Sequence, residues 1–492
     1  MRSRRRPASR ILLAALIACC AAPAAKSETD ASASGVVNAD YQYNTGVEAS
    51  AADVRLDLDV TVGPVVLGAA YRAYQLSDGS YNPAGVDVPL ADLKHRYAAY
   101  YGDRFEARVG HFLSTFGHGL TLRSYEDVEL EYDTMLDGFL GRYDAGAVSL
   151  TGLAGTVDED LLGVRHREHR VRGARVSVPV GGWLEVAGSA VERASTVRDE
   201  EIEIPDAQAL FEDGVTGAEV SLWLGPVTLA GEYASRSGEN PVTESAMTGY
   251  AAYASGTVAL GPLTLFGEFK DYESFSHHLV NPPTCVRDHV YMLMNRATYE
   301  IDLDDERGFL VEGTVPLGDP LLLSGGASEA RDHEGDLAHW EIFGTAEHYA
   351  WDAVSGAVAW SWSREYELGV FTEHLTGAAD FYLTTGEGNL VELTVEAQRT
   401  EEPGGFSHSD YLGAWTFYPG SDVTLSCVLE ATDDDSEKRD VWFMTEVRTL
   451  LMDDLEVSFS MGTERGGKKC SGGVCYFEPE FEGARVRLSK YF

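Results

Sequence analysis

Two irregular segments of the sequence hold the side chains whose types and spacing suggest chemistry. In the first segment, Arg123 precedes three acidic candidates: Glu126, Asp127 and Asp133. The second segment carries the other candidates: Arg287, His289, Asn295, Arg296, Asp305 and Glu306. Guanidinium groups that face carboxylates across a narrow aqueous passage create a transverse field that selects solutes by charge. We predict that the three arginines face the acidic groups in this way; the alternative is a pair of surface loops held by ordinary salt bridges.

Catalytic and metal-binding signals are weak. Ser114 is a loop serine beside the turn Gly117-His118-Gly119, and a serine hydrolase needs a histidine and an orienting polar group brought close to it. The neighbours His277 and His278 point to opposite sides of an extended chain, which argues against shared metal ligation. No βαβ pattern surrounds the GxG sequences, so they are turn glycines rather than phosphate loops. We therefore predict no catalytic residue, no metal and no cofactor, and an enzyme is the least favoured class.

The sequence around these segments follows a period of two. Valine and leucine alternate with arginine and aspartate over residues 54–60, and apolar residues alternate with others over 218–224 and 227–233. Such a pattern puts an apolar row on one face of a β-strand and a polar row on the other. The elements that position the candidate residues are therefore strands, and the fold class is all-β.

Short turns and long loops also alternate along the chain. Short turns are predicted at Val62–Val65, Gly102–Asp103, Asp144–Ala145, Gly181–Gly182, Leu224–Val227, Leu260–Leu263, Leu317–Pro320, Asp352–Ser355, Gly386–Gly388, Pro419–Ser421 and Met452–Asp454. Long polar loops are predicted at Ser77–Leu90, Val157–His169, Ser195–Asp213, Arg331–Gly335, Arg399–His408 and Thr432–Lys438. Short periplasmic turns opposite long extracellular loops are typical of transmembrane antiparallel β-barrels, and the turns favour an even strand number of about 18–24.

The N-terminus resembles a secretory signal. Five arginines within the first ten residues precede the apolar run Ile11–Cys20, and small residues continue to Ser27. The apolar run is too short for a transmembrane helix, which needs about 20 residues. We expect residues 1–27 to be a signal peptide and 28–492 to be one barrel domain. A lipoprotein box that would place a lipid on Cys19 is the competing interpretation.

Charge and cysteine content agree with an exported chain. Six of the 38 Lys and Arg residues, and none of the 79 Asp and Glu residues, lie in 1–27, so removal of that segment changes the formal net charge from −41 to −47. Nucleic acid is therefore an unfavourable partner. The remaining acidic excess belongs either to the lumen and loops of a barrel or to a solvated acidic surface.

Cys470 and Cys475 are spaced for a disulfide in an oxidising compartment, with a metal site as the weaker alternative.

The final residues form an alternating strand that ends in Phe492. This ending resembles the C-terminal signal read by the barrel-assembly machinery, although Lys490 departs from the apolar residue expected there. An ordinary amphipathic last strand is the alternative. A secreted β-sandwich would also show alternating strands, but the combined signal, turn asymmetry and terminal Phe492 favour the barrel.

Both irregular segments resemble a family of porin-like outer-membrane barrels catalogued as a domain of unknown function. The first follows a GxFxxxFGxGLxLRxxE pattern from Gly110 to Glu126, and the second follows NPPxxxREHxYxLxNRxT from Asn281, with Asp288 where the family more often has Glu. A DExGFxxE pattern follows from Asp305. The resemblance implies a barrel in the outer membrane and brings no established activity.

Irregular backbone at membrane depth persists only inside a barrel, where protein or water satisfies its polar groups. We therefore expect one or both segments to fold into the lumen and narrow or plug it. The favoured function is an outer-membrane channel for small polar solutes in a Gram-negative bacterium, with membrane lipid and the assembly machinery as partners. The alternative is a non-conducting barrel that serves as a surface scaffold or as the membrane part of an export or assembly complex.

Overall fold

A computed structural model gives the arrangement of most of the chain. It describes residues 31–77, 91–127, 132–161, 165–199, 209–240, 245–276, 279–296, 299, 301–318, 320–351, 354–367, 370–385, 388–420, 422–471 and 474–492. The predicted signal peptide, residues 1–27, lies outside this part of the chain. Within the described residues, none of the helices has the length and apolar character needed to cross a membrane.

Twenty-four strands make one continuous antiparallel sheet. In the first half of the chain they are β1 (Ala31–Asn44), β2 (Ala49–Val62), β3 (Val65–Leu76), β4 (Ala91–Tyr101), β5 (Phe105–Phe112), β10 (Leu136–Asp144), β11 (Ser149–Leu161), β12 (Arg165–Val180), β13 (Leu184–Asp199), β14 (Ala209–Leu224), β15 (Val227–Asn240) and β16 (Ser245–Leu260). In the second half they are β17 (Leu263–Glu273), β18 (Asp305–Pro316), β19 (Leu321–Arg331), β20 (Leu337–Trp351), β21 (Val354–Glu367), β22 (Val370–Thr385), β23 (Asn389–Glu401), β24 (Ser407–Tyr418), β25 (Val423–Thr432), β26 (Val441–Met452), β27 (Leu455–Glu464) and β30 (Phe481–Tyr491).

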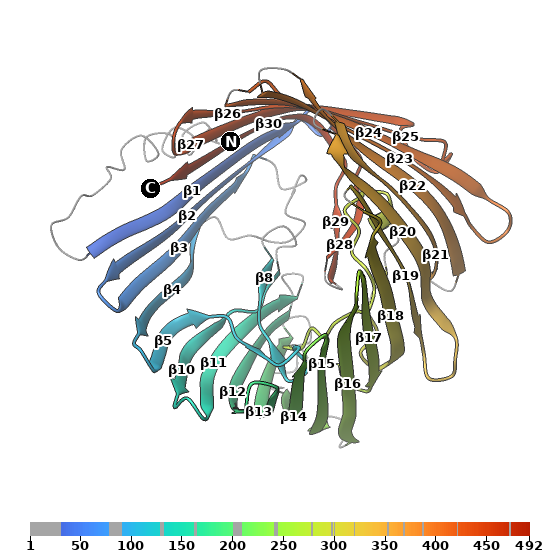
Figure 1. Ribbon diagram of the computed structural model, residues 1–492. Helices are drawn as coiled ribbons and strands as arrows, with labels where there is room; N and C mark the ends of the chain where they lie inside the picture. The colour runs from blue at the N-terminus through green and yellow to red at the C-terminus, as the bar shows by residue number, and fades with distance from the viewer. Residues whose placement is uncertain are drawn as a thin grey trace.

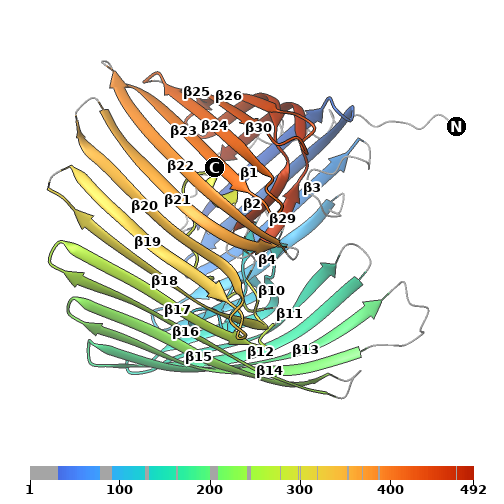
Figure 2. The same ribbon diagram turned by 90° about the vertical axis from the view of Figure 1, so that its right-hand side faces the viewer.

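The sheet closes on itself. Each strand pairs with its neighbours in chain order, and β30 pairs with β1, with Arg487 opposite Asp40. The backbone N–H groups of Gly35 and Phe492 each donate to the other residue's carbonyl, so the chain end completes the seam. Figure 1 shows the ring that results, and Figure 2 shows its strands running obliquely. Closure leaves no strand edge unpaired, as a membrane-spanning sheet requires.

The two faces of the wall differ as the alternation predicts. On β21, Trp360 and Trp362 point outward and are exposed, whereas Ser361 and Ser363 point inward and are buried. On β23, Val395 is 43% exposed, whereas the following residue in the strand, Glu396, is 5% exposed. Large apolar side chains on an outer face are stable in lipid and unfavourable in water. The fold is therefore a transmembrane β-barrel with a polar lumen.

The connections confirm the predicted asymmetry. The eleven predicted turns fall between β2 and β3, β4 and β5, and so on to β26 and β27, at the end that also holds both termini; we call this the turn end and the opposite one the loop end. Gly63, Gly225 and Gly261 adopt φ values of 57°, 67° and 63° in these turns, a conformation that glycine reaches without strain. Residues 319, 352–353, 386–387 and 421 of the predicted turns lie outside the described residues.

Two predicted loops are shorter than expected. Strands β11 and β12 continue through most of Val157–His169, and β13 and β14 continue into Ser195–Asp213. Their partners stay in register past the predicted boundary, for example Asp158 opposite Glu168. Polar residues extend these strands because a hairpin that projects into water needs no apolar row. Residues 78–90, 162–164 and 200–208 lie outside the described residues.

The remaining short elements belong to three connections at the loop end. They are β6 (Thr115–Phe116), β7 (Leu122–Arg123), β8 (Glu126–Asp127), β9 (Tyr132–Asp133), the 3-10 helix η1 (Met294–Arg296), β28 (Gly467–Ser471) and β29 (Val474–Glu478). The described residues of 113–135, between β5 and β10, form the first infolded segment, and those of 274–304, between β17 and β18, form the second. The elements β8, β28 and β29 lie inside the ring in Figure 1. Infolding, predicted from sequence, is confirmed.

Candidate functional site in the lumen

The first infolded segment is fixed to the wall by apolar and polar contacts. Phe116 and Leu122 are buried in a cluster with wall residues of β5 and β10–β13. The backbone N–H of His118 donates to Glu232 of β15, and the Thr121 hydroxyl donates to the same carboxylate at 3.1 Å. A carboxylate that accepts two hydrogen bonds offsets part of its desolvation. These contacts hold residues 116–122 against one side of the lumen.

The second infolded segment reaches much further round the barrel. His289 Nε2 lies 2.7 Å from Glu341 Oε1 on β20, and the Leu293 N–H donates to Glu396 on β23 at 2.7 Å. Next in the chain, Arg296 donates to Glu430 of β25 at 2.5 Å. The three carboxylates face inward from strands that lie progressively further round the sheet. The segment therefore follows the inner wall rather than projecting from the loop end.

The two segments also bind each other. The Arg123 N–H donates to the Leu279 carbonyl at 2.7 Å, and its Nη1 donates to the Asn281 carbonyl at 3.0 Å. Leu279 is fully buried in the same cluster as Phe116. The predicted Arg123 is therefore a link between the infolded segments, and both of these hydrogen bonds end on carbonyl groups rather than carboxylates.

The predicted pairing of arginines with acidic residues differs from the structure. Arg287 pairs with Glu312 of β18 and lies 4.9 Å from the Phe343 ring, while Arg296 pairs with Glu430. Glu306 is buried beside Lys270. The carboxylates that pair with Arg287 and Arg296 thus belong to strands of the barrel wall. Sequence alone does not show these pairs, because residues distant in the chain meet only after the sheet has closed. The side chain of Asn295 bonds the backbone of His289 within the segment.

Asp305, the remaining candidate from the second part of the sequence, lies at the loop-end tip of β18. It accepts from the backbone N–H of His333 at 2.9 Å and lies 2.5 Å from the His333 Nδ1. His333 Nε2 also lies 3.0 Å from Asp271 of β17. This predicted site residue therefore joins the connection between β19 and β20 to the neighbouring strands.

The acidic tip of the first segment does face cations, but they belong to the wall. Glu126, Asp127 and Asp133 line a cavity of about 110 Å³ with wall residues of β2, β3 and β4. Its basic members are Arg55, Arg72, Lys94 and His95. Burial raises the pKa of Glu126, and the neighbouring carboxylates Asp133 and Asp57 raise it further. The tip therefore concentrates negative charge against a basic wall.

A second buried cluster surrounds Cys285. Lys270 and Glu306 pair inside it, and Tyr299 bonds both groups. Cys285 adopts φ of 55° and is buried, and burial raises the pKa of its thiol to about 12. A neutral thiol at physiological pH is a poor nucleophile. Ser114, in the other segment, is also buried, and its hydroxyl oxygen has no hydrogen-bond partner among the described residues.

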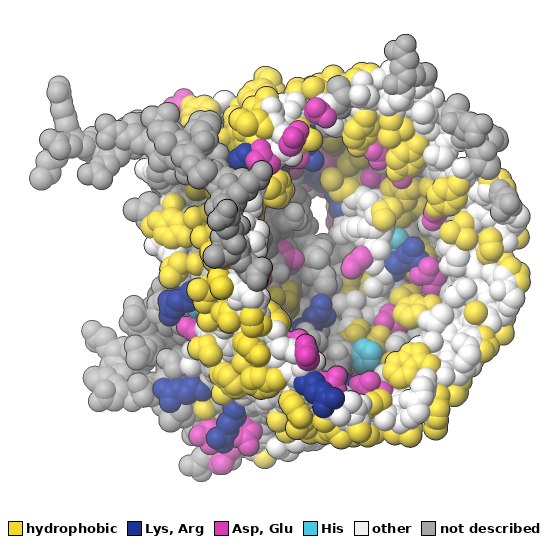
Figure 3. Space-filling model, turned by 60° about the vertical axis from the view of Figure 1, so that its left-hand side comes forward, with side chains coloured by type: hydrophobic (Ala, Val, Ile, Leu, Met, Phe, Trp, Pro, Cys, Tyr) yellow, Lys and Arg dark blue, Asp and Glu magenta, His cyan; other side chains and the backbone are white. Residues whose placement is uncertain are grey.

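The wall opposite the anchored segments is polar and ion-paired. Arg487 of β30 donates to Asp40 of β1 at 2.7 Å, and Arg485 lies 2.7 Å from Glu464 of β27. Beside the cavity at the tip of the first segment, Asp53 of β2 pairs with Arg72 of β3 at 2.7 Å. Figure 3 shows acidic, basic and histidine side chains in the hollow of the barrel, against a mainly apolar outer surface. The inner face of this part of the wall is therefore charged and polar.

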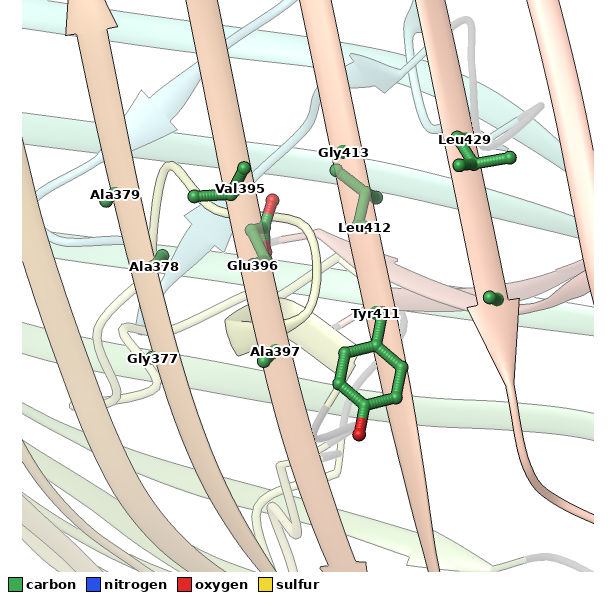
Figure 4. Close-up of a pocket in the computed structure, with 11 residues that line it drawn as sticks. Gly377, Ala378, Ala379, Val395, Glu396, Ala397, Tyr411, Leu412, Gly413 and Leu429 are labelled. Carbon is green, nitrogen blue, oxygen red and sulfur yellow. The ribbon is translucent and has the colours of Figure 1, made fainter.

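An apolar depression lies on the other face of the wall. It has a volume of about 560 Å³ and spans β22–β25, where small residues such as Gly377, Ala397 and Gly413 leave a depression between Tyr411 and Leu429. Figure 4 looks onto this depression, with the infolded segment visible behind the strands. Tyr411 and Leu429 are exposed members of the outward apolar row. This depression faces lipid and is separate from the lumen.

The predicted disulfide falls on the hairpin of β28 and β29. The register of the hairpin places Cys470 directly opposite Cys475. The side chains of both residues lie outside the described part of the structure. The disulfide therefore remains a prediction, supported by backbone register.

Sequence reasoning missed the wall residues that bind the infolded segments. Glu232, Glu341, Glu396 and Glu430 stand at inward positions of strands, each flanked by outward apolar or small residues. An acidic residue in the polar row of a strand was the available signal. It did not show which acidic residues meet which segment, since that depends on the ring.

The closed sheet defines the class of this protein, a transmembrane β-barrel. Several solved structures are similar to this chain at low sequence identity. The P pilus usher (PapC) translocation pore matches with a TM-score of 0.46 and 10% identity over 94% of this chain and 99% of that chain. The siderophore receptor PirA from Pseudomonas aeruginosa matches with a TM-score of 0.48 and 8% identity over 94% of this chain and 80% of that chain. The copper transporter OprC matches with a TM-score of 0.45 and 10% identity over 95% of this chain and 81% of that chain. No curated protein matches the sequence. The chain belongs to a family of unknown function (DUF6029), whose sequence model matches residues 9–315.

Proposed function

We propose that this protein is an outer-membrane channel of a Gram-negative bacterium, rather than an enzyme, and that it passes small polar solutes. The observation that carries the proposal is the charged wall opposite the infolded segments, where ion pairs such as Arg487 with Asp40 line the lumen. Paired charges on a wet wall favour water and polar solutes over apolar ones. The infolded segments narrow the passage and set its selectivity.

The orientation follows from the same layout. The turn end, with both termini, is the periplasmic end, and the loop end faces the outside. The outward apolar rows contact membrane lipid. Strand β30 and Phe492 are the part of the chain that the barrel-assembly machinery reads, and their place at the seam with β1 supports this, because the last strand completes closure.

Conductance of the purified protein in a planar lipid bilayer tests the proposal. The protein is first shown to be folded by gel mobility that changes on boiling. Stable single-channel steps are expected, with a conductance that depends on the charge of the ion. Persistent silence of folded protein would contradict a channel.

One observation favours the alternative of a non-conducting scaffold or export component. Phe116, Leu120, Phe275 and Leu279 of the infolded segments are each at most 1% exposed, so the segments are packed like a core rather than loosely attached. A tightly packed segment opens only at the cost of exposing apolar area, about 25 cal/mol per Å². Silence in the bilayer together with a stable folded barrel would support this alternative.

A further inference from the structure

Three side chains from separate elements converge in the cavity at the tip of the first infolded segment. His95 lies on β4 of the wall, Glu126 on β8 and Asp133 on β9. One ligand atom from each lies within 4.8 Å of the other two, and His95 Nε2 is 2.9 Å from Asp133 Oδ2. An imidazole nitrogen and two carboxylate oxygens are a ligand set that divalent transition metals accept.

The local structure orients these groups. The backbone N–H of Met135 donates to Asp133 Oδ1 at 2.8 Å, which leaves the other carboxylate oxygen directed at His95. Hydrogen bonds from the protein commonly orient the carboxylates and imidazoles that bind metals in this way. The register of β8 and β9 places Glu126 directly opposite Asp133. Like charges opposite each other destabilise a strand pair, and a cation between them would remove that repulsion.

The charge of the cavity leaves room for a dication. Its carboxylates are Asp57, Glu126, Asp127 and Asp133, and its fixed cations are Arg55, Arg72 and Lys94. Asp53 pairs with both arginines, at 2.9 Å and 2.7 Å. With His95 neutral, five carboxylates and three cations leave a formal charge of −2, which one divalent cation would balance.

We infer that His95, Glu126 and Asp133 bind one divalent cation of the zinc class, with water at the open position. In a tetrahedral zinc site the ligand atoms lie roughly 3.3 Å apart, so the observed spread requires ligand movements of about 1 Å or less. This inference goes beyond the proposed channel, since the site would tie the β8–β9 hairpin to β4 whether or not the barrel conducts.

The test uses the folded full-length chain in detergent, without a histidine tag and stripped with a chelator. Zn²⁺ binding is measured by titration calorimetry in the wild type and in H95Q, E126Q and D133N. One Zn²⁺ per chain is expected, with affinity at least about tenfold weaker in each variant. The matched control is H374Q, because His374 lies 3.2 Å from one carboxylate, Glu365, and its Zn²⁺ affinity is expected to equal that of the wild type.

His95 is buried in a wall strand, so H95Q could prevent folding. Glu126 lies on the short strand β8 of the infolded segment, outside the wall, so E126Q is the decisive variant. Heat-modifiable gel mobility establishes that each variant is folded. Visible absorption of bound Co²⁺ gives a second readout, and its bands are expected to disappear in E126Q. Absence of saturable one-to-one binding, or unchanged affinity in folded E126Q and D133N, would overturn the assignment and leave a His95–Asp133 ion pair only.

Discussion

Arg296 Nη2 lies 2.5 Å from Glu430 Oε1, and this contact joins the second infolded segment to β25, seven strands beyond the strand at which the segment ends. Glu430 also accepts from Arg465 at 3.0 Å. The carboxylate therefore keeps a cationic partner when Arg296 is removed. The contact with Arg296 positions the segment, whereas Arg465 stabilises the wall.

The variant R296A is expected to loosen the far end of the second infolded segment and to widen the passage. Loss of a charge-assisted hydrogen bond costs about 1–2 kcal/mol, which the barrel wall tolerates because Glu430 stays paired. Single-channel conductance, or the fraction of time spent in the open state, is expected to rise. Planar bilayer recording measures both quantities.

The matched control is R399A. Arg399 lies 3.1 Å from Glu401 on the outward face of β23, and both side chains are exposed, so the lumen is untouched. Its conductance is expected to match that of the wild type. Equal conductance of R296A and R399A would show that the second segment does not limit the passage.

Removal of Glu396 is expected to detach the middle of the second segment. The carboxylate accepts from the backbone N–H of Met292 at 3.1 Å and from that of Leu293 at 2.7 Å. In E396A both N–H groups lose their acceptor, at a cost of about 1–3 kcal/mol each. Amide hydrogen exchange over residues 291–296 is expected to accelerate. The control E401A changes an outward carboxylate of the same strand, and equal exchange in both variants would contradict the anchoring role of Glu396.

Much of the wall could be predicted from local sequence. Turns such as Gly63-Pro64 are defined by residues adjacent in the chain, and the apolar rows of β2, β14 and β15 follow from a period of two. The strand number followed from counting turns. Boundaries at the loop end were less predictable, because strands such as β11 continue beyond the membrane, where no apolar row marks them.

The lumen contacts were not predictable in the same way. Arg296 and Glu430 are 134 residues apart in sequence, and His95 and Asp133 are 38 apart. Such pairs form because ring closure brings inward rows of distant strands round a common space. The irregularity of the segments predicted that they fold inward, but their partners depended on which strand lies where in the ring.

Stability at the loop end is expected to depend on pH through His333. Hydrogen bonding to Asp305 and then to Asp271 raises the pKa of this histidine above its ordinary value of about 6.5. A raised pKa in the folded state means a stabilising contribution that is present below pH 6.5 and lost as pH rises through the folded pKa. Amide protection of residues 332–336, corrected for intrinsic exchange, is therefore expected to be greater at pH 6 than at pH 9.

The variant H333Q removes the titrating group and is expected to abolish this difference in protection. Asp305 retains the backbone hydrogen bond from residue 333, so the connection itself is preserved. Protection that falls equally with pH in the wild type and in H333Q would refute the role of His333.

The cysteines of the β28–β29 hairpin provide a prediction that the backbone register supports. Directly opposed cysteines in an antiparallel pair can approach the Cα separation that a disulfide requires, about 5.5 Å. Cys285 and Cys427 are free thiols. After unfolding without reductant, the mature chain is therefore expected to bind two equivalents of a maleimide, and four after reduction. The variant C427S, which leaves the hairpin intact, is expected to bind one equivalent of maleimide before reduction and three after it. Binding of four equivalents by the unreduced wild type would show that the hairpin carries no disulfide.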